Sequence, residues 1–189
     1  MCRLGQERAQ GSTGGHPVGI RTGRVQGRGT GSAVTVLADQ RRRWTAPLLV
    51  GTAILCLDQL TKWWASGALE ERNIDLFWTL RLHLVFNTGA AFSRGEGLGP
   101  LLSLLVLVVL VLLVRQGVRT EDRVALLAVG AIVGGAIGNL ADRAFRAGDG
   151  FLGGAVVDFV DLQWWPVFNL ADATIVMAGG LLAWRSWRA

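Results

Sequence analysis

The stretch Leu98–Val114, LGPLLSLLVLVVLVLLV, decides the fold class of this chain. None of its 17 residues carries a charge, and leucine and valine follow one another without a polar face. A helix that is apolar on all sides is typical of a membrane span, and 17 residues are close to the shortest length that crosses the hydrocarbon of a bilayer. The stretch therefore predicts a transmembrane helix.

Three further segments of 17 to 20 residues have the same apolar character. Charges interrupt them at three positions only, Asp58, Lys62 and Asp172. A soluble domain of this size would need four helices with almost no polar face, which is unusual for a soluble fold. We therefore expect an all-α membrane protein in which four transmembrane helices cover residues 46–65, 98–114, 124–140 and 167–184.

The composition of the whole chain agrees with a membrane protein of one domain. Of its 189 residues, 51% are hydrophobic and 17% are charged, and the net charge is +5. Two cysteines are too few for a disulfide framework, and two histidines, His16 and His83, exclude a zinc site of the HExxH type. No metal or cofactor is predicted.

Arginines indicate how the four spans are oriented. Cytoplasmic loops of membrane proteins are enriched in basic residues, and three connections on one side of a four-span protein are rich in arginine here. The two longer connections, about 66–97 and 141–166, also contain arginines, so the bias is partial. We expect both termini in the cytoplasm and the longer connections outside. The arginines on the cytoplasmic side are Arg41, Arg42, Arg43, Arg115, Arg119, Arg123, Arg185 and Arg188.

Residues 1–43 differ in composition from residues 44–189, which form the transmembrane domain. They are rich in glycine and arginine and poor in large apolar residues, so they cannot bury enough surface to offset the entropy of ordering. We expect a disordered cytoplasmic tail. Arginine could bind anionic lipid or nucleic acid, but a solvated tail is the favoured interpretation, and nucleic acid is not an expected partner.

The connection after the first span predicts a small sheet. Leu80, Leu82 and Leu84 alternate with Arg81 and His83, within a stretch that runs from about residue 76 to residue 85. Alternation with a period of two is typical of a strand with one buried face. We therefore expect a β-rich extracytoplasmic connection between the first and second transmembrane helices, at the membrane surface.

Asp58 and Lys62 lie four residues apart in the first span, on one face of a helix. This spacing predicts an ion pair. Pairing reduces the cost of about 2.5–3.5 kcal/mol that each isolated charge has at bilayer depth. We expect a structural or substrate-orienting role rather than catalysis, because a carboxylate paired with lysine stays ionised and is a poor proton donor.

Several carboxylates and amides occur near the outer ends of the third and fourth spans. These two helices form a hairpin, so their outer ends are neighbours. Each residue also has a plainer interpretation: Asp142 and Arg143 could form an interfacial pair, and Asp172 could cap a helix. The convergence of several such groups favours a functional site. They are Asn139, Asp142, Arg143, Asp158, Asn169 and Asp172.

Two carboxyl groups that share a site of low dielectric constant cannot both ionise easily, so the pair holds one proton. It then supplies a base that activates water and an acid that protonates the leaving amide. A serine–histidine–aspartate set is not available, because His83 is the only histidine on that side. A cysteine nucleophile is not indicated either, because Cys56 has no adjacent base. Aspartyl hydrolysis is the protease chemistry that this sequence supports.

Five motifs in this order resemble the lipoprotein signal peptidase (signal peptidase II) family. They are Asp58-Gln-x-x-Lys62, Asn87-Thr-Gly-Ala-Ala91, Gly138-Asn139-x-x-Asp142-Arg143, Val157-Asp158-Phe159 and Phe168-Asn169-x-Ala171-Asp172, within residues 46–184. The resemblance implies that Asp158 and Asp172 are the catalytic pair. It implies that the site is lined or supported by Asp58, Lys62, Asn87, Gly89, Asn139, Asp142, Arg143, Asn169 and Ala171.

The resemblance also implies a substrate and a location. The family removes the signal peptide from prolipoproteins, just before a cysteine that carries a diacylglyceryl group, without a metal or cofactor. The expected partners are lipid-modified prolipoproteins and membrane lipids, and the expected state is a monomer in the bacterial inner membrane with its site near the extracytoplasmic face. The long tail 1–43 and the short connection between Asp158 and Asp172 depart from the family's pattern.

Other classes of function fit the sequence less well. A small transporter or proton channel would show polar residues spaced through its spans, whereas the second and third spans carry no charge. A structural scaffold would need no convergent carboxylates. The presenilin-like aspartyl proteases share the chemistry, but their Gly-x-Gly-Asp block is absent.

Overall fold

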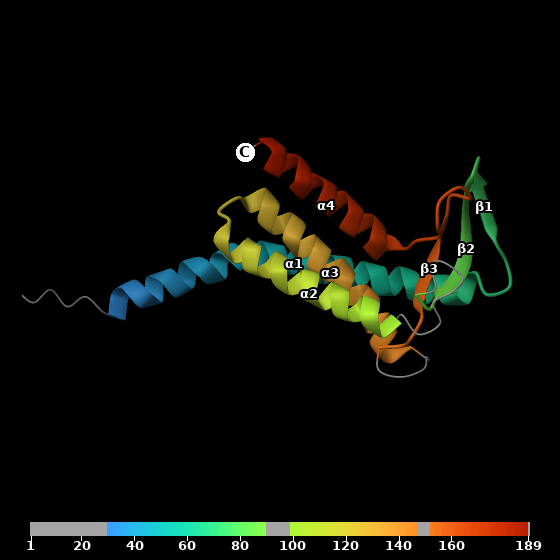
Figure 1. Ribbon diagram of the computed structural model, residues 1–189, viewed down its shortest axis with the longest axis horizontal. Coiled ribbons are helices and arrows are strands. Elements are labelled where there is room, and N and C mark those ends of the chain that lie inside the picture. Colours follow the sequence, from blue (N-terminus) through green and yellow to red (C-terminus); the bar gives the residue numbers. More distant parts are fainter. Residues whose placement is uncertain (1–29, 90–98, 147–151, 189) are drawn as a thin grey trace, which may run out of the picture.

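The computed structural model describes residues 30–89, 99–146 and 152–188 (Figure 1). α1, α2 and α3 run side by side, a small sheet lies at one end of this bundle, and the C-terminus lies at the other end. The elements in chain order are α1 (Thr30–Ala68), β1 (Ile74–Phe77), β2 (Leu80–Asn87), α2 (Gly99–Arg119), α3 (Arg123–Phe145), β3 (Val156–Asp161) and α4 (Leu170–Arg188).

A helix covers nearly all of each of the four predicted spans. Among the described residues, two helical segments, Arg43–Ala68 and Arg123–Phe145, are long and apolar enough to cross a membrane. α2 leaves many of its leucine and valine side chains exposed, for example Leu101 at 61% and Leu112 at 60%. An apolar surface of this kind fits lipid better than water.

The first helix begins earlier than we expected. Residues 30–43 were predicted to be part of a disordered tail, but α1 starts at Thr30 and continues to Ala68. The prediction was wrong for this part, because alanine, leucine and arginine in residues 30–43 are good helix formers that extend an adjoining apolar helix. Residues 1–29 lie outside the described residues, so the tail stays a prediction there.

A small sheet is present in the connection where we expected one, and it includes a strand from another connection that we did not predict. β1 and β2 pair antiparallel in the connection between α1 and α2, and β3 adds to β2 from the connection between α3 and α4. The register places Val85 opposite Asp158 and Asn87 opposite Val156. β3 is buried on both faces, which removes the polar–apolar alternation that would have marked it as a strand.

Glycines bring α3 into backbone contact with α1. A Cβ atom on Gly134 would overlap the carbonyl oxygen of Gly51, and one on Gly130 would overlap that of Pro47. Further along, a Cβ atom on Gly138 would overlap the carboxylate of Asp58. The ridge of small residues therefore lets α1 and α3 approach closely, and it leaves room for a charged side chain between them.

Candidate functional site

The candidate site lies at the sheet end of the bundle, where α1 and α3 end, β3 passes and α4 begins (Figure 1). The structure joins ten of the eleven residues predicted from the sequence into one network of hydrogen bonds and ion pairs there. Arg143 accompanies them through electrostatic interactions. The ten are Asp58, Lys62, Asn87, Gly89, Asn139, Asp142, Asp158, Asn169, Ala171 and Asp172.

Asp158 sits on β3 with only 2% of its surface exposed. The side-chain amide of Asn169 donates to its Oδ1 at 2.7 Å, and that of Asn87, on the neighbouring strand β2, donates to its Oδ2 at 3.0 Å. Burial raises the pKa of Asp158 to about 6, and the charge of Asp172 acts in the same direction, whereas the hydrogen bonds from Asn87 and Asn169 oppose the rise. Near neutral pH, Asp158 can therefore gain or lose a proton.

Asp172 lies in the first turn of α4, and Asn169 precedes that helix. The two residues bond reciprocally: the backbone N–H of Asp172 donates to Asn169 Oδ1 at 3.0 Å, and the backbone N–H of Asn169 donates to Asp172 Oδ2 at 3.2 Å. This is the geometry of a capping box. The same Asn169 thus starts the helix that carries Asp172 and binds Asp158.

Asn139 on α3 connects the second carboxylate to the charged interior. Its amide nitrogen donates to Asp172 Oδ1 at 2.8 Å. Its Oδ1 accepts from Lys62 Nζ at 2.7 Å and from the Asn169 amide at 3.1 Å. Because an ammonium group can only donate, Lys62 fixes which end of the Asn139 amide faces Asp172.

The predicted ion pair between Asp58 and Lys62 is present at 2.8 Å, and it belongs to a larger cluster. Lys62 Nζ also lies 3.0 Å from Asp142 Oδ2, and none of these three side chains is more than 1% exposed. The carboxylates accept further backbone donors, Asp58 from Ala171 at 3.0 Å and Asp142 from Val157 at 3.2 Å. Lys62 therefore joins α1 to α3 directly. Through the two carboxylates it is also linked to the start of α4 and to β3.

The interfacial pair that the sequence suggested for Asp142 and Arg143 is replaced by other partners. Asp142 Oδ1 accepts from Arg146, four residues along α3, at 2.8 Å. The guanidinium of Arg143 interacts electrostatically with the carboxylates of Asp158, Asp172 and Asp142. Its Nη1 atom is buried and has no hydrogen-bond partner among the described residues. Arg143 therefore has one N–H donor, on Nη1, that is not used by the described residues around Asp158 and Asp172.

Sequence reasoning missed two contributors to this site. Arg146 pairs with Asp142, and the spacing of four residues on one helix could have signalled it. Gln59, inside the first motif, donates to the carbonyl oxygen of Gly138 at 3.1 Å across the α1–α3 contact. No spacing rule indicates a contact between residues 79 positions apart.

Gly89 was predicted as a site residue, and it acts through its backbone. Its N–H donates to Asn87 Oδ1 at 2.9 Å, which orients the Asn87 amide toward Asp158.

The arrangement can bind and transfer protons. Asp158 and Asp172 share Asn169 as a common partner, and each carboxylate also accepts from a second amide. Within the described ranges, no three His, Cys, Asp or Glu side chains are grouped to hold a metal ion. Two coupled carboxyl groups with different environments are suited to act as a general acid and a general base.

Comparison with known proteins gives consistent matches. The family described as "Signal peptidase (SPase) II" matches residues 50–188. A lipoprotein signal peptidase of Rhodococcus jostii is 41% identical over 155 residues, which cover 81% of this chain and 77% of the relative. Those of Mycobacterium leprae and Bifidobacterium longum are 39% and 43% identical, covering 75% and 70% of this chain and 71% and 73% of the relatives.

Two solved structures share the fold. Both are of a bacterial membrane enzyme studied by the in meso method, at 2.3 Å and 1.9 Å resolution. The first has a TM-score of 0.64 at 22% identity and covers 75% of this chain and 87% of its own. The second has a TM-score of 0.62 at 23% identity and covers 72% of this chain and 89% of its own.

Proposed function

The chain belongs to the signal peptidase II family of bacterial membrane enzymes, aspartic-type peptidases that cleave signal peptides from prolipoproteins, and we propose that Asp158 and Asp172 are the two residues that hydrolyse the peptide bond. The observation that carries this proposal is the shared partner of the two carboxylates. Asn169 donates to Asp158 through its side chain and to Asp172 through its backbone.

In the proposed reaction, the pair holds one proton. The ionised carboxylate removes a proton from a water molecule, whose oxygen adds to the scissile carbonyl carbon. The protonated carboxyl group donates to the carbonyl oxygen as it becomes negative. The carboxyl group that took the proton from water then donates it to the amide nitrogen, and the other carboxylate takes a proton from a hydroxyl group of the tetrahedral intermediate. The C–N bond breaks, which leaves a carboxyl group on the signal peptide, a free amino group on the cysteine of the lipoprotein and one proton on the pair.

Arg143 and the amides would hold the substrate and the carboxylates in place. The unpaired Nη1 of Arg143 is a donor for a substrate carbonyl, because a buried donor without a partner is unfavourable until it finds one. Asn87 and Asn139 each approach one carboxylate from another element and limit its rotation. Asp58, Lys62 and Asp142 form the buried support behind them.

The proposed substrate is a precursor that carries a diacylglyceryl group on the cysteine after the cleavage site. Apolar helix surfaces would accommodate its acyl chains beside the site. Leu57 and Leu60, on the turns of α1 next to Asp58, are 49% and 58% exposed. A substrate could reach the carboxylates sideways from the bilayer, with its lipid along such surfaces.

We place this site at the extracytoplasmic face of a four-span protein, with both termini in the cytoplasm. Exposed tryptophans support the two membrane boundaries, because tryptophan is enriched at membrane–water interfaces. Trp63, Trp78 and Trp164 are 74%, 93% and 69% exposed at the sheet end, and Trp187 is 89% exposed at the other end. The arginine-rich connections lie at that other end.

Replacement of the two carboxylates tests the proposal. Asp158→Asn and Asp172→Asn should each reduce cleavage of a lipidated precursor in detergent by about 10²–10⁴-fold, since general acid–base groups contribute that much. The double variant should be little worse than either single variant, because the groups act as one unit. Binding of the precursor should survive, since the acyl contacts are unchanged.

The matched control is Asp161→Asn. Asp161 lies on the same strand as Asp158 and is also buried, but it pairs with Arg81 at 2.6 Å. This variant should retain substantial activity. The rival interpretation, in which Asp172 only caps α4, predicts that Asp172→Asn is mild, because asparagine caps about as well as aspartate. Near-normal cleavage by either single variant, once its folding is verified, would show that Asp158 and Asp172 have a structural role rather than a catalytic one.

A further inference from the structure

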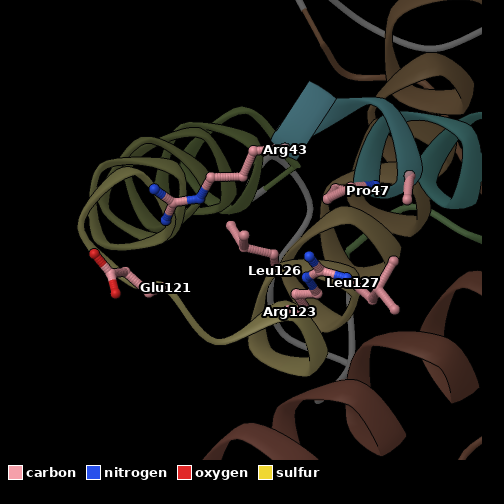
Figure 2. A pocket seen from close by; sticks show the side chains of 7 residues that line it. Arg43, Pro47, Glu121, Arg123, Leu126 and Leu127 are labelled. Atoms are coloured by element: carbon pink, nitrogen blue, oxygen red, sulfur yellow. The ribbon is translucent and has the colours of Figure 1, made fainter. Parts of the chain in front are cut away.

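A cavity of about 660 Å³ lies at the end of the bundle away from the carboxylates (Figure 2). Its lining comes from the start of the α1 span, from the connection between α2 and α3, and from the start of α3. The lining residues are Arg43, Ala46, Pro47, Glu121, Arg123, Leu126 and Leu127. None of them belongs to the candidate catalytic site.

The polar part of the lining carries an excess of positive charge. It contains two arginines, Arg43 and Arg123, and one acid, Glu121. The neighbouring Asp122 adds little negative field, because Arg185 pairs with it at 2.6 Å. Within the described part of the chain, neither Arg123 nor Glu121 has a side-chain hydrogen bond or ion pair, so the charge of Arg123 is available to a ligand.

Arg43 is held in place by α2. Its Nη2 atom donates to the carbonyl oxygen of Gly117 on α2 at 3.3 Å. Its Nε atom is buried and has no partner among the described residues. Figure 2 shows Arg43 reaching from α1 toward the end of α2, and Arg123 beside Leu127 on α3. Because no carboxylate among the described residues pairs with this anchored guanidinium, its positive charge favours a ligand with acceptor oxygens.

The position and the apolar walls indicate what kind of anion fits. Arg43 and Arg123 each stand shortly before an apolar run, residues 46–65 and 124–140 respectively. They therefore stand where hydrocarbon gives way to lipid head groups. Leu126 and Pro47 line the cavity, and Leu48 and Leu49 continue along α1 with 65% and 66% of their surface exposed. An acyl chain can lie along such leucines.

We infer that this cavity binds the head group of an anionic phospholipid, with the phosphate between Arg43 and Arg123 and the acyl chains along the first turns of α1. Clustered basic residues at helix ends bind anionic lipid, each contributing about 1 kcal/mol near the surface. The site is separate from the peptidase site and does not depend on which residues cleave the substrate.

Lipid titration of the purified full-length protein tests this inference. Phosphatidylglycerol and phosphatidylcholine with identical acyl chains would be added in a neutral detergent, with bound lipid counted by native mass spectrometry. Phosphatidylglycerol should bind more tightly than phosphatidylcholine. The double variant Arg43→Gln, Arg123→Gln should weaken phosphatidylglycerol binding about 30-fold, which is about fivefold for each arginine.

Three matched variants keep the outcome interpretable. Arg72→Gln removes one exposed charge at the sheet end of the bundle, away from the cavity lining, and should leave binding within about twofold, because exposed distant charges are screened. The double change of Arg43 and Arg123 to lysine keeps both charges and should retain most binding. Glu121→Gln removes the only acid of the lining and should tighten binding about fivefold, which tests the site even if the arginine variants fail to fold.

Several results would overturn the inference. Equal binding of the two lipids would show that charge is not recognised. Unchanged phosphatidylglycerol binding in the Arg43, Arg123 double glutamine variant, or in Glu121→Gln, would place the lipid elsewhere. If millimolar inorganic phosphate displaced phosphatidylglycerol completely and stabilised the protein alone, the site would be one for free phosphate rather than for lipid.

Discussion

Asn169 is the residue through which both proposed catalytic carboxylates are held. It is completely buried, and every polar group of its side chain has a partner: Asp158, Asn139 and the backbone of Asp172. Fully satisfied polar networks in a low-dielectric interior are rigid, because each lost bond leaves a buried group unpaired. Asn169 therefore helps to fix the separation of the two carboxylates, together with Asn87 and Asn139.

The pKa of Asp158 predicts the pH dependence of cleavage. Burial raises it to about 6, so the carboxyl group is mostly protonated below pH 6 and loses its proton above it. If the reaction needs one proton on the pair, kcat/KM should fall as the pH rises from 6 to 8, by up to tenfold per unit. A pH profile with a lipidated precursor in detergent measures this, and a flat or rising profile would contradict it. The observed value belongs to the coupled pair.

Asn87 should move that profile. Its hydrogen bond stabilises the ionised form of Asp158 and lowers the pKa. Asn87→Leu removes the donor, so the falling limb of kcat/KM should shift to higher pH. Asn73→Leu is the matched control, because the side chain of Asn73 bonds to His83 at 2.7 Å, at an exposed position, and to neither carboxylate among the described residues. An unmoved limb in Asn87→Leu would show that this hydrogen bond does not tune Asp158.

Lys62 should be among the residues on which stability depends most. Lys62→Met leaves Asp58 buried without its ionic partner among the described residues, and breaking a buried pair in this way costs about 3–5 kcal/mol. Asp142 still has Arg146. Adding Asp58→Asn to Lys62→Met should therefore restore much of the free energy of unfolding, measured by denaturant in detergent.

The exposed pair Arg185–Asp122 provides the comparison for Lys62. Its side chains are 38% and 32% exposed, so Arg185→Met should cost less than about 1 kcal/mol. Equal losses in Lys62→Met and Arg185→Met would show that the buried cluster contributes no more than a surface pair.

At the level of elements, the contact between α1 and α3 positions the charged cluster. Gly134→Ala would place a methyl group against the backbone of Gly51, which cannot rotate away as a side chain could. The helices must separate, and we expect a loss of about 1–3 kcal/mol in the free energy of unfolding together with reduced cleavage. Gly179→Ala on α4 is the control, because a Cβ atom there meets nothing within 4 Å. Equal stability of the two variants would argue against a tight α1–α3 contact.

Helices were predictable from the sequence, and the links between them were not. Long apolar runs indicate helices directly, and the spacing of Asp58 and Lys62 predicted their pair. The third member of the cluster, Asp142, lies on another helix, so no local pattern joins it to Lys62. β3 was missed because burial on both faces hides its period, although its motif around Asp158 was recognised. The early start of α1 was missed because composition alone was used for residues 30–43.

At the scale of the whole molecule, α3 is the central element, because it packs against α1, α2 and α4. The sheet end carries the carboxylates, and the opposite end carries the proposed lipid site. This polarity fits a protein whose two ends face different compartments. The arginine distribution supports our proposal that the sheet end faces the outside.

Reporter fusions test the predicted topology. Fusions after Gly97 and after Asp149 should report the extracytoplasmic side, and a fusion at Ala189 should report the cytoplasm. The physical reason is the cost of moving the arginines near residues 41–43, 115–123 and 185–188 across the membrane. An outward C-terminus would contradict the four-span arrangement.

The close contact between α1 and α3 also has a consequence for how the protein fits bilayers of different thickness. α3 has 23 residues, which gives a rod about 34 Å long at 1.5 Å per residue. Because its glycines lock it to α1, the pair cannot shorten by sliding, and it can adapt to a thinner or thicker membrane only by tilting. We therefore expect the height of the two proposed catalytic carboxylates, Asp158 and Asp172, in the bilayer to vary with the acyl chain length of the host lipids, while the geometry between them stays fixed.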